Sequence, residues 1–150
     1  MRPPAPDVLT AALALHVAEE APGFSAWARR NAWPGYRDRD FALINASGLA
    51  LTALANAAVR REPRLFGLWY TTIVCQQLLW NPVFHAGTTI AYREYSPGLV
   101  TALVLFPALW WRATKRGLHA GMLSRGRVAL AAAAGGAIHL SAVRKQVYGR

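Results

Sequence analysis

Residues 41–59 read FALINASGLALTALANAAV, an apolar run without a charged side chain. A helix needs roughly 20 mostly apolar residues to cross the hydrocarbon core of a bilayer. The run is therefore long enough for a membrane-spanning helix, and it is followed directly by Arg60 and Arg61. Basic residues at the end of such a run reach the lipid headgroups. This stretch indicates an integral membrane protein built of helices.

Further apolar segments lie on both sides of this run, at 8–20, 65–92, 97–111 and 127–143. The first and the last two are short for a span, so their crossing depends on local thinning of the bilayer or on flanking anchors. We expect one all-α domain over residues 1–150, a bundle of four or five short transmembrane helices. Basic residues divide almost evenly between the two sides of that bundle, so the positive-inside rule leaves the orientation open.

The connections between the segments are compact. They are a polar loop at 29–40, a tight link at 60–64, a turn at 96–98 and a basic loop at 115–127. In the turn, Ser96 is expected to cap the next helix and Pro97 to occupy its first position. Glu19 and Glu20 directly follow the first apolar core, which argues against a cleavable signal peptide there.

The composition also favours lipid over nucleic acid as the partner. Hydrophobic residues make up 54% of the chain and charged residues 16%, against roughly 25% charged residues in soluble domains. The net charge of +10 would suggest nucleic acid in a soluble protein, but the basic residues cluster at the ends of the apolar segments. We therefore expect a lipid bilayer and no nucleic acid as partner. Cys75 lies within an apolar run and is expected to be a small buried hydrophobe.

The first segment carries three ionisable side chains, His16, Glu19 and Glu20. At about 100° per residue, Glu19 lies about 60° to one side of His16 and Glu20 about 40° to the other, so all three share a face. Ionisable groups inside a span are costly and usually functional. An imidazole beside carboxylates suits general acid–base chemistry, and the same donors suit a divalent metal. The alternative is that both glutamates end the helix at the membrane interface.

The third segment carries a second polar stripe. On a regular α-helix five polar side chains fall within an arc of about 80°: Gln77, Asn81, His85, Thr88 and Tyr92. Pro82 lies among them and leaves the carbonyl of Leu78 without its helical partner. The stripe can line a site, or it can form the polar contacts between helices that are common in membranes.

Other segments contribute fewer polar groups. Asn45 could orient a histidine or a substrate, whereas Thr52 and Asn56 are expected to bond between helices. Thr101 is the one polar residue expected inside the fourth segment, which we expect to face lipid. In the fifth segment, Gly135 and Gly136 permit close helix packing, and the lone His139 is interpreted as packing or as a secondary metal ligand.

The run His16-Val17-Ala18-Glu19-Glu20 resembles the motif of the HXXEE-domain family of bacterial membrane proteins. The resemblance extends from about Leu9 to Ser141. It includes further residues in the matching order: Pro22, Phe24, Trp27, Asn45, His85, the run Tyr95-Ser96-Pro97-Gly98-Leu99-Val100-Thr101 and the basic run 123–127. The resemblance implies a multi-spanning protein of the bacterial plasma membrane, and it brings no established activity.

We predict a membrane-embedded enzyme, of isomerase, cyclase or hydrolase type, acting on an apolar lipid-like or isoprenoid substrate. The candidate catalytic residues are His16, Glu19, Glu20 and His85. The candidate residues that bind or orient the substrate are Asn45, Gln77, Asn81 and Tyr92. A divalent metal could be held by His16, Glu19, Glu20 and His85, with His139 as the secondary ligand.

Two other classes of function remain open. Polar faces on several helices could form a carrier for protons or metal ions, although the bundle is thin, and a homodimer would supply the missing wall. An accessory membrane subunit would use the same polar groups only to hold its helices together.

Overall fold

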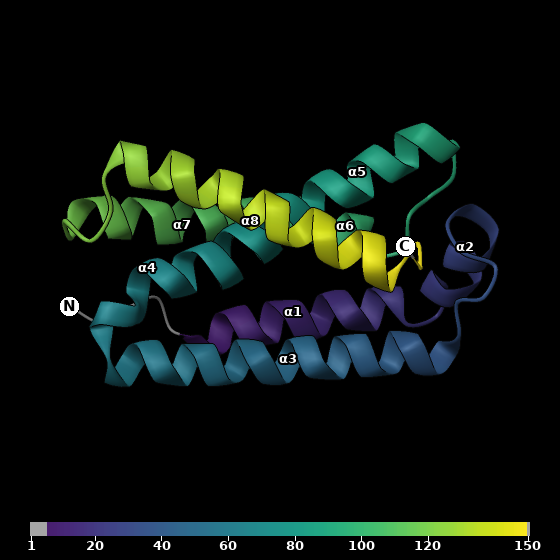
Figure 1. Cartoon of the computed structure of the whole chain (residues 1–150), viewed down its shortest axis with the longest axis horizontal. Helices are drawn as coiled ribbons and strands as arrows, with labels where there is room; N and C mark the ends of the chain where they lie inside the picture. Colours follow the sequence, from purple (N-terminus) through teal and green to yellow (C-terminus); the bar gives the residue numbers. More distant parts are fainter. Residues whose placement is uncertain (1–5, 150) are drawn as a thin grey trace.

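The computed structural model describes residues 6–149, and in this range every regular element is a helix. The expected all-α fold is therefore confirmed (Figure 1). The elements are α1 (Pro6–Glu20), α2 (Phe24–Asn31), α3 (Asp38–Arg61), the 3₁₀ turn η1 (Pro63–Leu65), α4 (Phe66–Trp69), the π-helix η2 (Tyr70–Trp80), α5 (Asn81–Tyr92), α6 (Leu99–Val104), α7 (Phe106–His119) and α8 (Arg125–Gln146).

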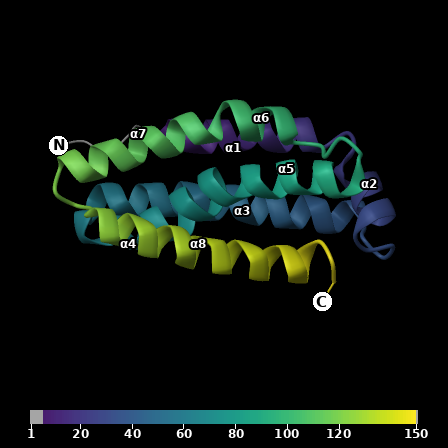
Figure 2. The ribbon, with the colours of Figure 1, turned by 90° about the horizontal axis from the view of Figure 1, so that it is seen from above.

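Successive long helices run in alternating directions along the long axis of the molecule (Figures 1 and 2). α4, η2 and α5 follow one another without a break and form one rod through the bundle. α8 packs most extensively against η2 in this rod, and α7 contacts it as well. α1 lies against α3 and also contacts α6, so the first helix joins two parts of the bundle.

The ends of the two longest helices are set by local sequence. At the start of α3, Asp40 accepts a hydrogen bond from the backbone N–H of Arg37 (3.0 Å), and at the start of α8 the Ser124 hydroxyl accepts one from Arg127 N–H (3.2 Å). Such contacts satisfy donors that have no partner within the helix. Both helices end on a basic pair, Arg60–Arg61 and Arg144–Lys145, which favours the negative end of the helix dipole.

One expected boundary was wrong. The fourth apolar segment was expected to end at residue 111, but α7 continues to His119, so only 120–124 of the expected loop at 115–127 lies outside a helix. The chain stays helical there because Ala113, Thr114 and Gly117 face the core while Lys115 faces outward. Hydropathy alone marks this basic stretch as a loop, whereas the spacing of its small residues fits a helix.

Helix α2 was not expected, because its C-terminal part was assigned to the polar loop at 29–40. Its buried residues are Phe24, Trp27 and Ala28, which follow the i, i+3, i+4 spacing of one helical face. This short amphipathic helix covers the end of the bundle where α1 stops, as Figure 1 shows. Its spacing was the signal that could have revealed it.

Among the helices within residues 6–149, α3 and α8 are each long and apolar enough to cross a membrane. Only 17% of the apolar window in each is buried inside the molecule. On α3, Leu43, Leu51 and Leu54 are 65%, 61% and 69% exposed. By length and composition, the structure thus supports two of the expected four or five spans.

A buried polar contact connects α1, α3 and α4. The indole N–H of Trp69 donates to the Asn56 side-chain oxygen (2.7 Å), and the Asn56 amide donates to the Thr10 hydroxyl (3.1 Å). Asn56 and Trp69 are 1% and 2% exposed. The expectation that Asn56 bonds between helices is therefore confirmed, whereas the Thr52 hydroxyl, expected to do the same, is buried without a hydrogen-bond partner.

We expect Asn56→Ala to lower the free energy of unfolding by about 1–3 kcal/mol, because the buried indole N–H of Trp69 would lose its acceptor. Thermal unfolding in detergent, followed by circular dichroism, measures the change. Asn45→Ala is the matched control, since Asn45 on the same helix is half-buried and donates to the Phe41 carbonyl one turn earlier (3.1 Å). Equal stability of the two variants would contradict the prediction.

Candidate functional site

Three ionisable side chains from two helices meet inside one end of the bundle. His16 and Glu20 lie one turn apart on α1, and His85 approaches from α5. The Glu20 Oε1 atom lies 3.6 Å from His16 Nε2 and 3.4 Å from His85 Nε2. Both histidines are 1% exposed and Glu20 is 6% exposed. The structure thus places a carboxylate between two imidazoles, away from solvent.

Each imidazole is held from behind by a hydroxyl group. His16 Nδ1 lies 2.8 Å from the Thr101 hydroxyl at the start of α6. His85 Nδ1 lies 2.9 Å from the Ser96 hydroxyl in the preceding loop. The two rings pack edge to face with centroids 5.0 Å apart, and the Phe106 ring covers His16 at 4.9 Å. These contacts leave both Nε2 atoms directed towards Glu20.

Glu19 is next in sequence but points to a different place. Its carboxylate accepts hydrogen bonds from the backbone N–H groups of Val100 (3.0 Å) and Thr101 (2.8 Å). It also accepts from the hydroxyls of Thr101 and Tyr95. A carboxylate at the N-terminus of α6 is favoured by the orphan N–H groups there. Glu19 therefore fastens α1 to α6 and stays outside the cluster of His16, Glu20 and His85.

The loop from Arg93 to Gly98 lies over the cluster and is tied down along its length. Glu94 pairs with Arg30 and accepts a hydrogen bond from Asn31 of α2 (2.9 Å). These hydrogen bonds lower the pKa of Glu94 below its usual range, and the bond with Arg30 has the larger effect. The hydrogen bond to Glu19 raises the pKa of Tyr95.

Gly98 closes the loop in a conformation that favours glycine, with φ of 98°. A Cβ at this position would lie 2.6 Å from His16 Cε1, 2.8 Å from Glu20 Cγ and 2.9 Å from His85 Cε1. The backbone of Gly98 therefore reaches the cluster as closely as it does because no side chain stands in between.

A family model described as "Protein of unknown function with HXXEE motif" matches residues 8–112. The chain belongs to the HXXEE family. The match includes the cluster, Glu19 and the loop that covers them. Neither the curated proteins nor the solved structures gave a match.

In this HXXEE protein, the structure holds the other predicted site residues by different contacts. Asn45 bonds within its own helix, the Tyr92 hydroxyl lies 3.2 Å from that of Tyr148, and His139 Nδ1 lies 3.3 Å from the Gln76 amide. Gln77 is half-buried, and the Asn81 side-chain oxygen is buried without a partner. The secondary ligand His139 is not among the three donors that converge.

The expected stripe from Gln77 to Tyr92 assumed one regular α-helix. Residues Tyr70–Trp80 instead form a π-helix, and α-helical geometry begins at Asn81, directly before Pro82. π-Helical turns bond i to i+5 and are frequent near functional sites. The angular phase of Gln77 relative to His85 therefore differs from that of a regular α-helix.

Three contributors to the site in this HXXEE protein escaped the sequence reasoning. Ser96 was expected to cap a helix, but α6 begins at Leu99 and the Ser96 hydroxyl contacts His85 instead. Thr101 was expected on a lipid-facing helix, yet it contacts both His16 and Glu19. Gly98 was noted only as part of a turn. The run from Tyr95 to Thr101 within the resemblance was the available signal for all three.

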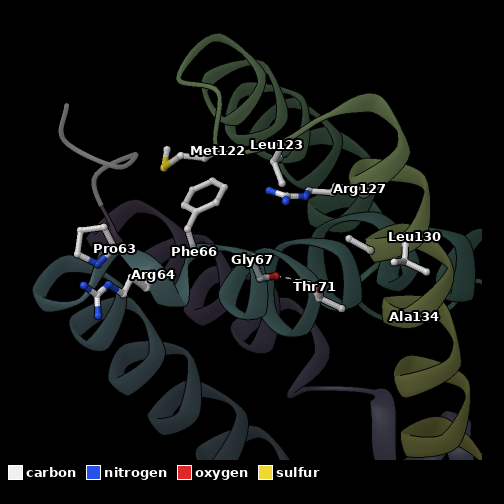
Figure 3. A pocket seen from close by; sticks show the side chains of 11 residues that line it. Pro63, Arg64, Phe66, Gly67, Thr71, Met122, Leu123, Arg127, Leu130 and Ala134 are labelled. Atoms are coloured by element: carbon white, nitrogen blue, oxygen red, sulfur yellow. Dashed lines mark hydrogen bonds between the residues drawn. The ribbon is translucent and has the colours of Figure 1, made fainter.

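A groove at the opposite end of the bundle carries none of the predicted site residues (Figure 3). It has a volume of about 510 Å³ between α4 and the start of α8. Figure 3 shows Phe66 and Leu123 inside it, with Arg64 and Arg127 also among its lining residues. A second groove, of about 540 Å³, runs between α5 and α8 and is lined mainly by apolar side chains, with Phe84 and His139 among them.

The cluster supports two kinds of chemistry. A carboxylate and two imidazoles can pass a proton to or from a bound molecule. The same three side chains each offer a ligand atom, and these atoms lie within 4.8 Å of one another, which suits a divalent ion.

Proposed function

We propose that this HXXEE protein is a membrane-embedded enzyme that transfers protons on an apolar, lipid-like or isoprenoid substrate. The observation that carries the proposal is the Glu20 carboxylate, which is buried between His16 and His85. Buried ionisable groups inside a membrane bundle are costly and mark functional sites. The reaction would be an isomerisation, a cyclisation or a hydrolysis.

The apolar outer surface supports a location in the bilayer, which we propose is the bacterial plasma membrane. Besides the leucines of α3, Ile90 on α5 is 77% exposed, and Leu130 and Leu140 on α8 are 70% and 61% exposed. Large exposed apolar surfaces on a protein mark contact with another apolar phase. On this basis the bundle crosses the membrane with four or five helices, beyond α3 and α8 alone.

In this proposal Glu20 is the group that takes up or releases the proton. His16 and His85 lie close enough to stabilise either state of its carboxyl group. In an isomerisation, Glu20 would remove a proton from one carbon of the substrate and return it at another, so that the enzyme ends in its starting state. Glu19 would act as a positioning residue, because its four hydrogen-bond donors occupy its carboxylate.

The groove between α5 and α8 supports an apolar substrate. Phe84 lines this groove, and its ring lies against that of His85 with centroids 5.1 Å apart. Only the Phe84 ring would thus separate a hydrocarbon chain in the groove from His85 of the cluster. Movement of Phe84, or of the loop over the cluster, would complete the access.

Comparison of lipid extracts by mass spectrometry tests this function. We expect Glu20→Gln to lower conversion by about 10²–10⁴-fold, the usual contribution of a general acid or base. Cells that carry this variant should then match a deletion strain. Glu62→Gln is the matched control, because Glu62 is exposed at the far end of α3 and bonds to the Arg64 backbone.

A deletion that leaves the lipid and terpenoid profile unchanged would contradict the enzyme assignment. So would a changed profile in the deletion strain that Glu20→Gln restores as well as the native chain does. Expression is compared by immunoblot of the membrane fraction, so that loss of protein is not read as loss of activity.

The near-complete burial of the cluster favours a second candidate, an accessory membrane protein in which these side chains hold helices together. In that case His16→Ala lowers the thermal stability of the protein and leaves the lipid profile as it is. The same extracts therefore separate the two candidates.

A further inference from the structure

We propose that His16, Glu20 and His85 bind one divalent transition-metal ion. Zinc lies about 2.0–2.2 Å from nitrogen and oxygen ligands, so neighbouring ligand atoms of a tetrahedral site are about 3.3–3.6 Å apart. The two distances from Glu20 Oε1 to the histidine Nε2 atoms are 3.6 and 3.4 Å. Two edges of such a tetrahedron are thus already present, and the three donor atoms all lie within 4.8 Å of one another.

The His16 Nε2 atom supplies an independent reason. The atom is buried and makes no close hydrogen bond; Glu20 Oε1 lies 3.6 Å away, and the residue as a whole is 1% exposed. Buried polar atoms in proteins are nearly always paired, and each exception calls for an explanation such as an ion. A metal bound to this atom would use the lone pair that the protein leaves unpaired.

The proton positions around His16 fit a metal ligand. The Thr101 hydroxyl has a single hydrogen, which it donates to Glu19. Towards His16 Nδ1, 2.8 Å away, the hydroxyl oxygen can therefore only accept. Nδ1 carries the hydrogen, and Nε2 keeps its lone pair and faces Glu20. On the other histidine, Ser96 can accept from Nδ1 of His85 in the same way (2.9 Å).

Glu19 thus supports the site without binding the ion: it holds Thr101, which in turn holds His16. Carboxylates and hydroxyls that bond to the second nitrogen of a metal-bound histidine fix its tautomer and its orientation. Here the order is Glu19, Thr101, His16, and the two N–H groups of α6 keep the Glu19 carboxylate in place. Of the two adjacent glutamates, Glu20 would therefore bind the ion and Glu19 would orient one of the ion's histidine ligands.

The backbone of Gly98 lies close to all three proposed ligands. At Gly98 the space in which a Cβ would stand is bordered by His16, Glu20 and His85 together. With three protein ligands, a fourth position stays open for water or substrate, as in catalytic rather than structural metal sites. The ion would occupy the site of the proposed function and take Glu20 Oε1 as a ligand, so that the second carboxylate oxygen of Glu20 would exchange the proton. Its binding does not depend on catalysis.

The donor set selects a class of ion. Two imidazoles and one carboxylate suit Zn²⁺, Co²⁺ or Fe²⁺, whereas Mg²⁺ and Ca²⁺ prefer oxygen ligands throughout. The site should therefore bind Zn²⁺ in the presence of excess Mg²⁺.

Isothermal titration of Zn²⁺ into the purified full chain, treated with chelator in detergent, tests the inference. We expect a single ion per chain. Glu20→Gln should weaken binding by more than about 100-fold, and Glu19→Gln by about 10–100-fold, the usual loss for a residue that orients a metal ligand. His119→Ala is the control, because His119 is exposed near the end of α7.

Absence of Zn²⁺ binding would overturn the inference, and so would a Glu20→Gln variant that binds as tightly as the native chain or a His119→Ala variant that binds as weakly as Glu20→Gln. Circular dichroism checks folding, and His85→Ala tests the site from α5 if Glu20→Gln does not fold. Zn²⁺ binding without a change in lipids would leave the inference standing and refute the proposed enzyme. A change in lipids without Zn²⁺ binding would overturn the metal inference and leave the proposed enzyme standing.

Discussion

Gly98→Ala is expected to lower the free energy of unfolding by about 2–6 kcal/mol, as the sum of two costs. A residue with a side chain is strained at a φ of 98°, at about 1–3 kcal/mol. Overpacking of a tight site costs about 1–3 kcal/mol more. The new Cβ would stand 2.6–2.9 Å from His16, Glu20 and His85, and all three are held by other contacts. Thermal unfolding in detergent measures the loss, and Zn²⁺ titration should show weaker binding.

The chain offers a matched control for this change. Gly121 also has a positive φ, 68°, but no atom lies within 4 Å of the place where its Cβ would stand. Gly121→Ala therefore carries the backbone strain alone. The difference in stability between the two variants then reports the contact with the cluster together with the greater backbone strain at a φ of 98°. Equal stability would show that Gly98 does not approach the cluster as described.

Gly135→Leu is expected to separate α8 from η2 and to cost about 4 kcal/mol or more, a loss that single substitutions rarely reach. A Cβ at Gly135 would already lie 2.8 Å from Cys75 Cβ and 3.1 Å from both the Gln76 nitrogen and the Thr71 carbonyl oxygen. Two of these are backbone atoms of η2, which cannot rotate away. Because α8 has its most extensive contacts with η2, the whole C-terminal helix depends on this approach.

Loss of the folded chain from detergent extracts and a lower midpoint of thermal unfolding measure the effect of Gly135→Leu. Gly126→Leu is the control, because Gly126 is exposed on the same helix and no atom lies within 4 Å of its Cβ position. Should both variants unfold alike, the leucine itself and not the helix contact would be responsible.

The sequence alone predicted the positions of the long apolar helices, and it predicted which ionisable residues of α1 lie together. Hydropathy placed α3 and α8 to within a few residues, and the helical spacing put His16 and Glu20 on one face. The small residues of the last segment also pack as closely as expected, with Gly135 directly on Cys75. These features depend on neighbours along a single helix, which a helical projection describes.

The remaining features depend on contacts between distant parts of the chain. Helical spacing put Glu19 and Glu20 on the same face. It could not show that the N–H groups of Val100 and Thr101 would bind Glu19, or that Glu20 would lie beside His85. The π-helix before Asn81 changes the phase of the third segment without any charge or proline inside it. The sequence likewise named His85 but not the hydroxyl group that holds its ring.

The position of the cluster along the bundle carries a consequence for sidedness. His85 lies seven residues before the end of α5, about 10 Å along the helix axis, and Glu20 is the last residue of α1. In the proposed membrane location, with the ends of α1 and α5 at the edge of a hydrocarbon core about 30 Å thick, a site at this depth would belong to one leaflet and not to the midplane. A molecule bound at such a site could keep its polar head among the lipid headgroups while its apolar tail stays in the hydrocarbon core. The amphiphiles of one leaflet would then meet the site, and those of the opposite leaflet would have to flip first.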